Sequence, residues 1–312
     1  MTAWIDRQLP QGDEIFLDHV GFFVTDLEVA ARQLERLGLQ VSPLNVQHNA
    51  NEHGELVPTG TSNRLALLER GFIETLAATG ETPLAVQLRG AVARYQGLHL
   101  IALTHADMAA QRRRLVNAGF AMQRIVNLRR RVATVEGERL IAYSVLRTEP
   151  GEMAEGRVQM LTNHTPELLW TPGSTAHDNQ VDALTQLLIC VRDPVEAALR
   201  YGRFFGREIK GDQERAVVAL DRGDILLVSP SRAAAMLPDL TLPDLPYIAG
   251  IALRSADLAA TRRVLMREQI KTPIATDELI CVGPSDALGA YLLFHAESVD
   301  APWQALAQSR GR

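Results

Sequence analysis

Two ionisable side chains stand inside apolar segments of the N-terminal half of the sequence. His19 lies in FLDHVGFFV and Glu74 lies in GFIETLAA. A carboxylate is costly to bury without a partner, so Glu74 must face a wet cavity or a cation. An isolated histidine in a strand is most often a hydrogen-bonded core residue. Its occurrence together with Glu74 instead favours contact of the pair with a metal ion or a substrate.

Further polar side chains are candidates for binding or catalysis. Asn63 and Arg64 enter an apolar strand, where a guanidinium usually requires an anion. That anion is either a substrate carboxylate, which makes both residues substrate-binding, or a structural carboxylate such as Glu69. His164 follows the strand RVQMLT and precedes a helix start at Pro166. It is either a catalytic acid or base at a cavity mouth or an imidazole that fixes the turn.

A local pattern that occurs four times predicts the elements that position these residues. An apolar strand, an Asp, an amphipathic helix and a turn follow one another. The Asp caps the first turn of the helix, and a left-handed residue ends it. The distances from cap to exit are 12, 12, 13 and 12 residues. The pairs are Asp26 with Gly38, Asp107 with Gly119, Asp193 with Gly206, and Asp257 with Gln269.

Two or three further strand candidates follow each helix, so the repeated unit is βαβββ. Its helix covers one face of its sheet, and pairing with a second unit buries the other face. We therefore predict an α+β fold of four tandem βαβββ modules that pair into two half-barrel-like mixed sheets. The segment TPELLWTPGSTAHDNQVD predicts a boundary near residues 172–181. It divides an N-terminal domain of residues 1–172, which holds the cavity, from a C-terminal domain of residues 173–312.

Composition excludes several classes of protein. The 312 residues carry a net charge of −5, with 46% hydrophobic and 22% charged residues, which is typical of folded globular proteins. No large basic field is present, so nucleic acid is not expected as a partner. The sequence has neither a signal-like N-terminus nor an apolar run of membrane-spanning length, which predicts a cytoplasmic protein without membrane contact. Cys190 and Cys281 are expected to be buried free thiols.

The combination of these motifs resembles the vicinal-oxygen-chelate (glyoxalase-like) superfamily. The segments that carry the resemblance are LDHVGFFVTDLEVA, GTSNRLALLERGFIETLA, GLHLIALTHAD and GRVQMLTNHTPELLW. The resemblance covers nearly the whole chain. The superfamily includes glyoxalase I, extradiol dioxygenases and antibiotic-binding proteins of the bleomycin-resistance type. It implies a metal site in which the first and last strands of each module supply one ligand apiece.

The resemblance implies a set of metal ligands in the N-terminal half. His19 and Glu74 occupy the two positions of the first module, and Glu74 is also the implied catalytic base. His99 and Gln159 are the candidates of the second module. Seven residues before Asp107 stands Leu100, so His99 requires a one-residue bulge, and an amide oxygen binds metal more weakly than a carboxylate. The set suits Fe, Mn, Ni or Zn as a divalent cofactor.

Two functions follow as expectations. The first is a metal-dependent lyase, isomerase or oxygenase that acts on a small oxygen-rich, anionic metabolite in the N-terminal cavity. The alternative is a metal-free protein that binds a small molecule, and a scaffold for protein interaction is a third class. The same offsets in the C-terminal half fall on Gln186, Leu226 or Leu227, Gly250 or Ile251, and Leu293. That half is therefore expected to be structural or to form a homodimer.

Overall fold

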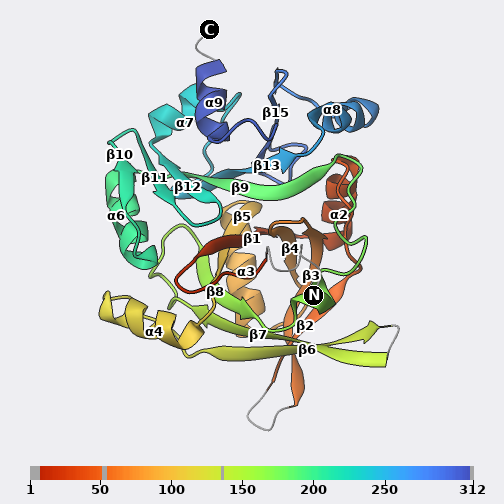
Figure 1. Ribbon diagram of the computed structural model, residues 1–312, viewed down its shortest axis with the longest axis vertical. Coiled ribbons are helices and arrows are strands. Elements are labelled where there is room, and N and C mark those ends of the chain that lie inside the picture. The colour runs from red at the N-terminus through yellow and green to blue at the C-terminus, as the bar shows by residue number, and fades with distance from the viewer. Residues whose placement is uncertain (1–7, 51–54, 135–136, 310–312) are drawn as a thin grey trace.

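The computed structural model describes residues 8–50, 55–134 and 137–309 of the chain, and it has an α+β fold, as predicted. In Figure 1 the N-terminal elements, red to green, occupy the lower part, and the C-terminal elements, cyan to blue, occupy the upper part. Parallel and antiparallel pairs occur in the same hydrogen-bonded network of strands. No helix in these ranges is long and apolar enough to cross a membrane.

The strands of the N-terminal half form two groups of four. Their bounds are β1 Phe16–Phe23, β2 Asn45–Ala50, β3 Leu56–Leu67, β4 Phe72–Ala78, β5 Gly97–Thr104, β6 Val126–Thr134, β7 Gly137–Arg147 and β8 Arg157–Asn163. The first group has the order β1-β4-β3-β2 and the second has the order β5-β8-β7-β6. In each group the first and last strands along the chain are parallel neighbours, β1 with β4 and β5 with β8. Antiparallel pairing of β1 with β5 joins the groups.

The C-terminal half repeats this order of strands. Its strands are β9 Val181–Cys190, β10 Ile209–Gly211, β11 Arg215–Ala219, β12 Asp224–Val228, β13 Tyr247–Ser255, β14 Ile274–Ala275, β15 Leu279–Val282 and β16 Tyr291–His295. The orders are β9-β12-β11-β10 and β13-β16-β15-β14, and antiparallel pairing of β9 with β13 joins them. A pair between Ile248 and Leu98 also links β13 to β5. Through this pair, the strands of the two halves join into one continuous hydrogen-bonded network.

The four predicted helix starts are confirmed. Helices α2 (Leu27–Arg36), α4 (Met108–Asn117), α6 (Pro194–Phe205) and α8 (Leu258–Arg267) each follow an Asp whose side chain accepts backbone N–H groups of the first turn. The residues at the four exits have positive φ angles, including Gln269 at 56°. The other helices described are α3 Pro83–Arg94, α5 Pro166–Leu169, α7 Pro230–Met236 and α9 Pro302–Ser309.

A β-bulge recurs at one position of the repeated pattern. In each strand that precedes an Asp-capped helix, the pairing register skips the residue eight positions before the capping Asp. These residues are Asp18, His99, Thr185 and Ala249. A bulge inserts an unpaired residue and changes the direction of neighbouring side chains. The bulges therefore decide which side chains of β1 and β5 reach the space between the N-terminal strands.

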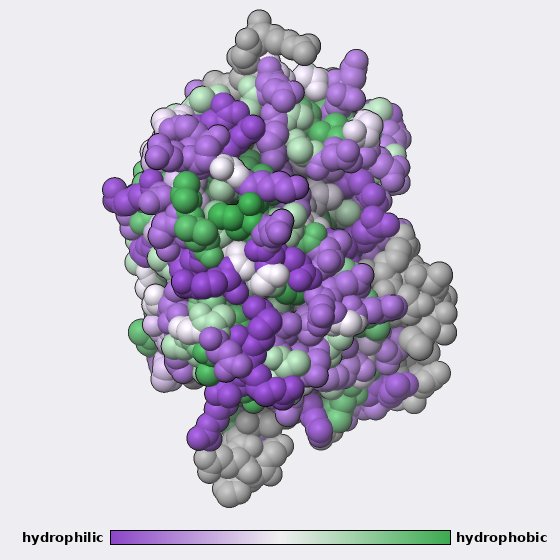
Figure 2. Space-filling view, turned by 60° about the vertical axis from the view of Figure 1, so that its left-hand side comes forward, coloured by the Kyte–Doolittle hydropathy of each residue, from purple (hydrophilic) through white to green (hydrophobic). Residues whose placement is uncertain are grey.

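Apolar side chains are mainly interior. The largest buried cluster runs through both halves, and a second one packs α7 and α9 against the C-terminal strands. Cys190 and Cys281 are buried free thiols, as predicted. The face seen in Figure 2 is mostly hydrophilic, with apolar residues in a few small patches. The core thus holds the two halves as one packed body.

Candidate functional site

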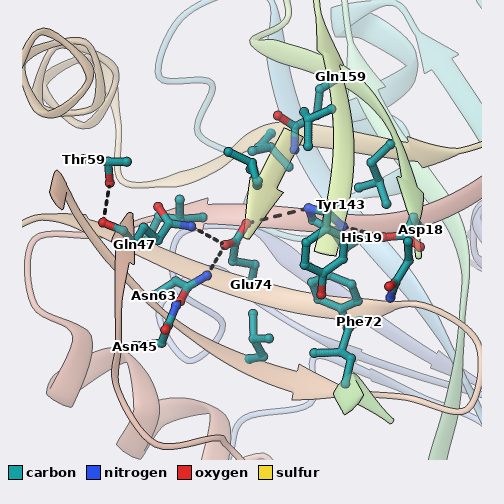
Figure 3. A pocket seen from close by; sticks show the side chains of 18 of the residues that line it. Asp18, His19, Asn45, Gln47, Thr59, Asn63, Phe72, Glu74, Tyr143 and Gln159 are labelled. Carbon is teal, nitrogen blue, oxygen red and sulfur yellow. Dashed lines mark hydrogen bonds and ion pairs between the residues drawn. The ribbon is translucent and has the colours of Figure 1, made fainter. Parts of the chain in front are cut away.

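The N-terminal strands line a cavity of about 160 Å³, and ionisable side chains from several strands face it. Figure 3 shows side chains from several strands pointing toward one another across it. An engineered apolar cavity of roughly 150 Å³ holds benzene, so the cavity has room for a small molecule with one ring. The polar lining includes Asp18 and His19 on β1, Asn63 on β3, Glu74 on β4, Arg147 on β7, Arg157 and Gln159 on β8, and the exposed Arg129 on β6.

Asp18 and His19 are chain neighbours, yet both line the cavity. Successive residues of a regular strand point to opposite faces. Here the bulge at Asp18 interrupts the alternation. Oδ2 of Asp18 lies 2.6 Å from Nδ1 of His19, and both side chains are almost fully buried. Asp18 thereby fixes the orientation of the imidazole and leaves Nε2 directed to the cavity.

Glu74 lies on the other side of the imidazole. Its Oε2 is 3.7 Å from Nε2 of His19. Its Oε1 accepts a hydrogen bond from Nδ2 of Asn63 at 2.5 Å and a longer one from Nε2 of Gln47 at 3.4 Å. Only 7% of the Glu74 side chain is exposed, so these amides replace the water that a buried carboxylate would otherwise need. The structure therefore brings His19, Glu74 and Asn63 together at one cavity.

Aromatic rings support the imidazole from one side. The ring of Phe72 stacks on His19 with centroids 4.2 Å apart and an interplanar angle of 17°. Trp170 follows α5 and packs edge-on against Phe72, while its Nε1 donates to the carbonyl of Leu68. This packing prevents His19 from leaving its contact with Asp18. The helix start at Pro166 was predicted, and it is what directs Trp170 toward the cavity.

Two arginines form the opposite wall. Arg147 and Arg157 are both partly buried, and both line the cavity. Nε of Arg147 donates to Oε1 of Gln159 at 3.3 Å, and the guanidinium of Arg157 lies over the ring of Phe23. Burial lowers the pKa of Arg157 to about 10, and it lowers the pKa of Arg147, while the charge of Glu74 opposes both shifts. The wall is cationic.

The structure does not bring His99 to the cavity. His99 is the bulged residue of β5, and its neighbour Leu100 lines the cavity instead. The His99 ring stacks on Tyr95, and its Nε2 contacts the Tyr95 carbonyl at 2.8 Å. Burial lowers the pKa of His99 to about 4, so the ring is neutral near pH 7. The ligand set expected from the resemblance is corrected here, because the bulge lies at His99 itself and directs its ring away.

Two other predicted site residues also lie outside the cavity. His164 is exposed, and its Nε2 contacts Oγ of Ser144 at 2.8 Å. Its neighbour Asn163 lines the cavity, since alternate residues of β8 point inward. Arg64 points to the opposite face of β3, where it forms an ion pair with Glu28 and donates to the carbonyl of Ser42. Of the two anions considered for Arg64, a substrate carboxylate or a structural one, the structure shows a structural carboxylate, Glu28 of α2.

The remaining donors do not fit a metal site of three ionisable protein ligands. Asp18 and Glu74 contact opposite nitrogens of His19, so the three groups cannot converge on one ion. Gln159 supplies only an amide on the arginine-bearing strand. Within the described residues no group of three His, Cys, Asp or Glu side chains could hold a metal ion. The donor chemistry thus departs from the set that the resemblance implies.

The corresponding face of the C-terminal strands is filled. Leu226 and Leu293 belong to the buried cluster around Trp303 of α9. Gly250 leaves space for the Trp303 ring, and Oε1 of Gln186 accepts the backbone N–H of Trp303. None of the four offers a strong metal ligand. Helix α9 packs against these four positions, where the first half has its cavity.

Comparisons with known proteins agree with this geometry. A family model described as a glyoxalase-like domain matches residues 17–205, more than half of the chain, so the chain belongs to the glyoxalase-like domain family. The resemblance identified from the motifs is confirmed. No curated protein matches the sequence.

Solved structures resemble this chain in fold. A hypothetical protein from Staphylococcus aureus has a TM-score of 0.62 and 10% identity, over 90% of this chain and 99% of that one. A mutant of 4-hydroxymandelate synthase from Streptomyces coelicolor has a TM-score of 0.54 and 13% identity, over 95% and 99%. A catechol 2,3-dioxygenase has a TM-score of 0.54 and 12% identity, over 92% and 94%. At these identities the likeness concerns the fold alone.

Sequence reasoning missed Asp18, Arg147 and Arg157. A signal for Arg157 was present, because it stands two residues before Gln159 and must share its face of the strand. Arg147 pairs with Gln159 across the antiparallel ladder, which requires a register that the sequence does not give. Asp18 carried the opposite signal, since alternation with His19 directs it away from the cavity.

Proposed function

We propose that the chain is an enzyme that moves a proton on a small oxygen-rich metabolite bound in the N-terminal cavity, as a lyase or isomerase. The observation that carries this proposal is the row formed by Asp18, His19 and Glu74 within a ligand-sized cavity. Such a row contains the parts of general acid–base catalysis, namely a base, an acid and a group that orients one of them.

The residues have distinct roles in the proposed reaction. Asp18 holds Nδ1 of His19, so Nε2 is the nitrogen that exchanges a proton with the substrate. Asn63 holds Oε1 of Glu74, which leaves Oε2 facing His19. One of the two groups removes a proton from a carbon beside a carbonyl, and the other supplies a proton to the carbonyl oxygen. General acid–base groups typically contribute about 10²- to 10⁴-fold in rate.

The metal-dependent form of this function rests on weaker support. His19 and Glu74 could supply two ligands to Fe, Mn, Ni or Zn, and Gln159 a weak third, but His99 lies elsewhere. An oxygenase requires redox chemistry that these side chains do not supply. The proposed steps therefore use the side chains alone.

A metal-free binding protein is the second candidate. The apolar part of the lining favours it, since apolar walls with few polar groups are typical of ligand pockets. This part includes Leu65, Leu76, Leu100, Leu128, Val145 and Leu161. The two candidates differ in whether His19 and Glu74 change the ligand or only contact it.

We also propose that the chain consists of four βαβββ modules grouped as residues 1–172 and 173–312. The repeated strand order and the bulge at one offset in all four copies support this division. The cavity belongs to the first group, and the second group has a structural role.

Proton abstraction can be tested without knowledge of the product. We would incubate the protein in D₂O with small 2-oxo and 2-hydroxy carboxylates. NMR would follow loss of the C3 proton of the 2-oxo compounds and of the C2 proton of the 2-hydroxy compounds. The wild type should catalyse exchange on at least one compound, and His19→Gln and Glu74→Gln should slow it by about 100-fold or more. His99→Gln is the matched control and should exchange at the wild-type rate. Binding without exchange would favour the binding protein.

A further inference from the structure

The cationic wall of the cavity has no role in the proton transfer described above. Its two guanidinium groups, on Arg147 and Arg157, come from adjacent strands and line the same cavity as His19. The only hydrogen bond that either side chain makes within the described residues is the one from Arg147 to Gln159. Neither side chain forms an ion pair with a carboxylate in those residues.

Two other partly buried arginines of this chain, Arg200 and Arg254, have carboxylate partners. Arg200 binds both oxygens of Glu155, at 2.7 and 2.9 Å, and Arg254 binds both oxygens of Asp182, at 2.6 and 2.8 Å. Each of these side chains is 16% exposed. Their partners raise the pKa of each arginine, whereas burial lowers the pKa of Arg147 and of Arg157. The two wall arginines are thus desolvated without a compensating anion of the kind that Arg200 and Arg254 have.

Glu74 does not take this place. Its Oε1 accepts from Asn63 and Gln47, and its Oε2 faces His19. No contact between Glu74 and either arginine is within ion-pair distance in the described residues. The charge of Glu74 acts on them only across the cavity.

We propose that Arg147 and Arg157 together bind the carboxylate of the substrate, which makes small carboxylates with a ring-sized apolar body the ligand class of this cavity. This inference rests on the proposed function, because the bound carboxylate is taken to be the compound on which His19 and Glu74 act. A guanidinium binds a planar carboxylate through two parallel hydrogen bonds. The apolar lining between the arginines and the imidazole then holds the body of the ligand.

The size of the cavity limits this class. A cavity of about 160 Å³ accommodates one ring and a carboxylate. Drug-sized ligands occupy pockets of roughly 300–1,000 Å³, so this cavity suits a smaller ligand. The carboxylate would lie at the arginines, and its apolar body would extend toward His19.

The test compares two ligands that have the same shape and differ in charge. Benzoate and benzamide would be titrated into the full-length protein by calorimetry at low ionic strength and pH 7. Benzoate should bind at least about tenfold more tightly, because charge-assisted hydrogen bonds are stronger than neutral ones. Equal affinities, or no binding of benzoate, would overturn the proposal, as would tighter binding of phenyl phosphate than of benzoate.

Variants locate the binding site. Arg147→Gln and Arg157→Gln should each weaken benzoate binding by about tenfold to 100-fold, while benzamide binding is unchanged. Arg64→Gln is the matched control, because Arg64 lies on the outer face of β3 and pairs with Glu28. Circular dichroism and melting curves confirm that each variant is folded. An equal loss in Arg64→Gln would overturn the assignment.

The outcomes separate this inference from the proposed function. Arginine-dependent binding of benzoate in a protein that catalyses no deuterium exchange supports the carboxylate site and contradicts the proton-transfer function. Exchange that depends on His19 but not on Arg147 or Arg157 contradicts the carboxylate site and leaves proton transfer in place.

Discussion

The carboxylate of Asp18 lies 2.6 Å from Nδ1 of His19, its own neighbour in β1. A regular strand would separate the two side chains onto opposite faces of the sheet. The bulge at Asp18 brings them together, and the stacked ring of Phe72 holds the imidazole in that position. Bulges occur preferentially beside active sites, where they change the direction of a side chain. Here the bulge places the Asp18 carboxylate beside the imidazole of His19, which fixes the orientation of the ring.

Substitution of Asp18 should therefore affect catalysis more than binding. In Asp18→Asn the side chain keeps its size but loses the charge that orients and stabilises the imidazole. We expect the rate constant for deuterium exchange to fall by about tenfold to 1,000-fold, while the KM for the same carboxylate changes less than about threefold. NMR exchange rates at several substrate concentrations separate the two parameters. A change confined to KM would show that Asp18 acts in binding.

The position of Leu100 makes a specific prediction about metal affinity. Leu100, not His99, faces the cavity, so Leu100→His should supply a third ligand beside His19 and Glu74. We expect this variant to bind Zn²⁺ or Ni²⁺ at least about tenfold more tightly than the wild type. Calorimetric titration of protein purified without a metal-affinity tag measures this difference.

The control for this prediction is His99→Ala, which should leave metal affinity unchanged. A loss of affinity in His99→Ala as large as that in His19→Ala would contradict the placement of His99. It would restore the ligand set that the resemblance implies.

The repeated local pattern was enough to predict much of the fold. All four capping Asp residues and all four left-handed exits are observed, because these features depend on nearby residues. Edge strands such as β2, with the sequence NVQHNA, were not identified individually because they lack apolar alternation. The link from Ile248 to Leu98 depends on tertiary packing, and no local pattern indicates it.

The sequence indicated some residues of the cavity wall and missed others. His19, Glu74 and Gln159, which the sequence offered as site residues, line the cavity. The count of seven residues before Asp107 gave Leu100, which is the residue that lines the cavity, so the bulge assumed in favour of His99 led to the wrong side chain. A bulge is set by pairing with the neighbouring strand, and its place cannot be taken from a strand's own sequence.

A buried ion pair connects the halves that the sequence predicts as domains. Glu155, between β7 and β8, has a side chain only 1% exposed, and Arg200 of α6 binds both of its oxygens. In Arg200→Met the carboxylate remains buried without its partner, which should cost about 3–5 kcal/mol. Urea unfolding should then separate into two transitions, if residues 1–172 and 173–312 are distinct folding units.

A matched control exists within the C-terminal half. Arg254 binds Asp182 in the same bidentate way, but both residues lie in that half. Arg254→Met should therefore reduce stability without separating the transitions. A single cooperative transition in Arg200→Met would contradict the domain division.

His99 should make stability depend on pH. Burial lowers its pKa from 6.5 to about 4, so the unfolded chain takes up a proton at a pH where the folded chain does not. Stability is then lost as the pH falls from 6.5 toward 4. At 1.36 kcal/mol per pH unit, His99 should contribute about 2 kcal/mol of loss between pH 7 and pH 5. The buried His177 and His295 have pKa values lowered by the same cause and add to the effect. Urea unfolding at pH 7 and pH 5 measures the loss in the free energy of unfolding between the two pH values. In His99→Gln, whose amide can still donate to the Tyr95 carbonyl, this loss should be about 2 kcal/mol smaller than in the wild type. In the exposed control His164→Gln it should equal that of the wild type. Equal losses in the wild type and His99→Gln would show that His99 accepts a proton as readily in the folded protein as in the unfolded chain, which would contradict the prediction.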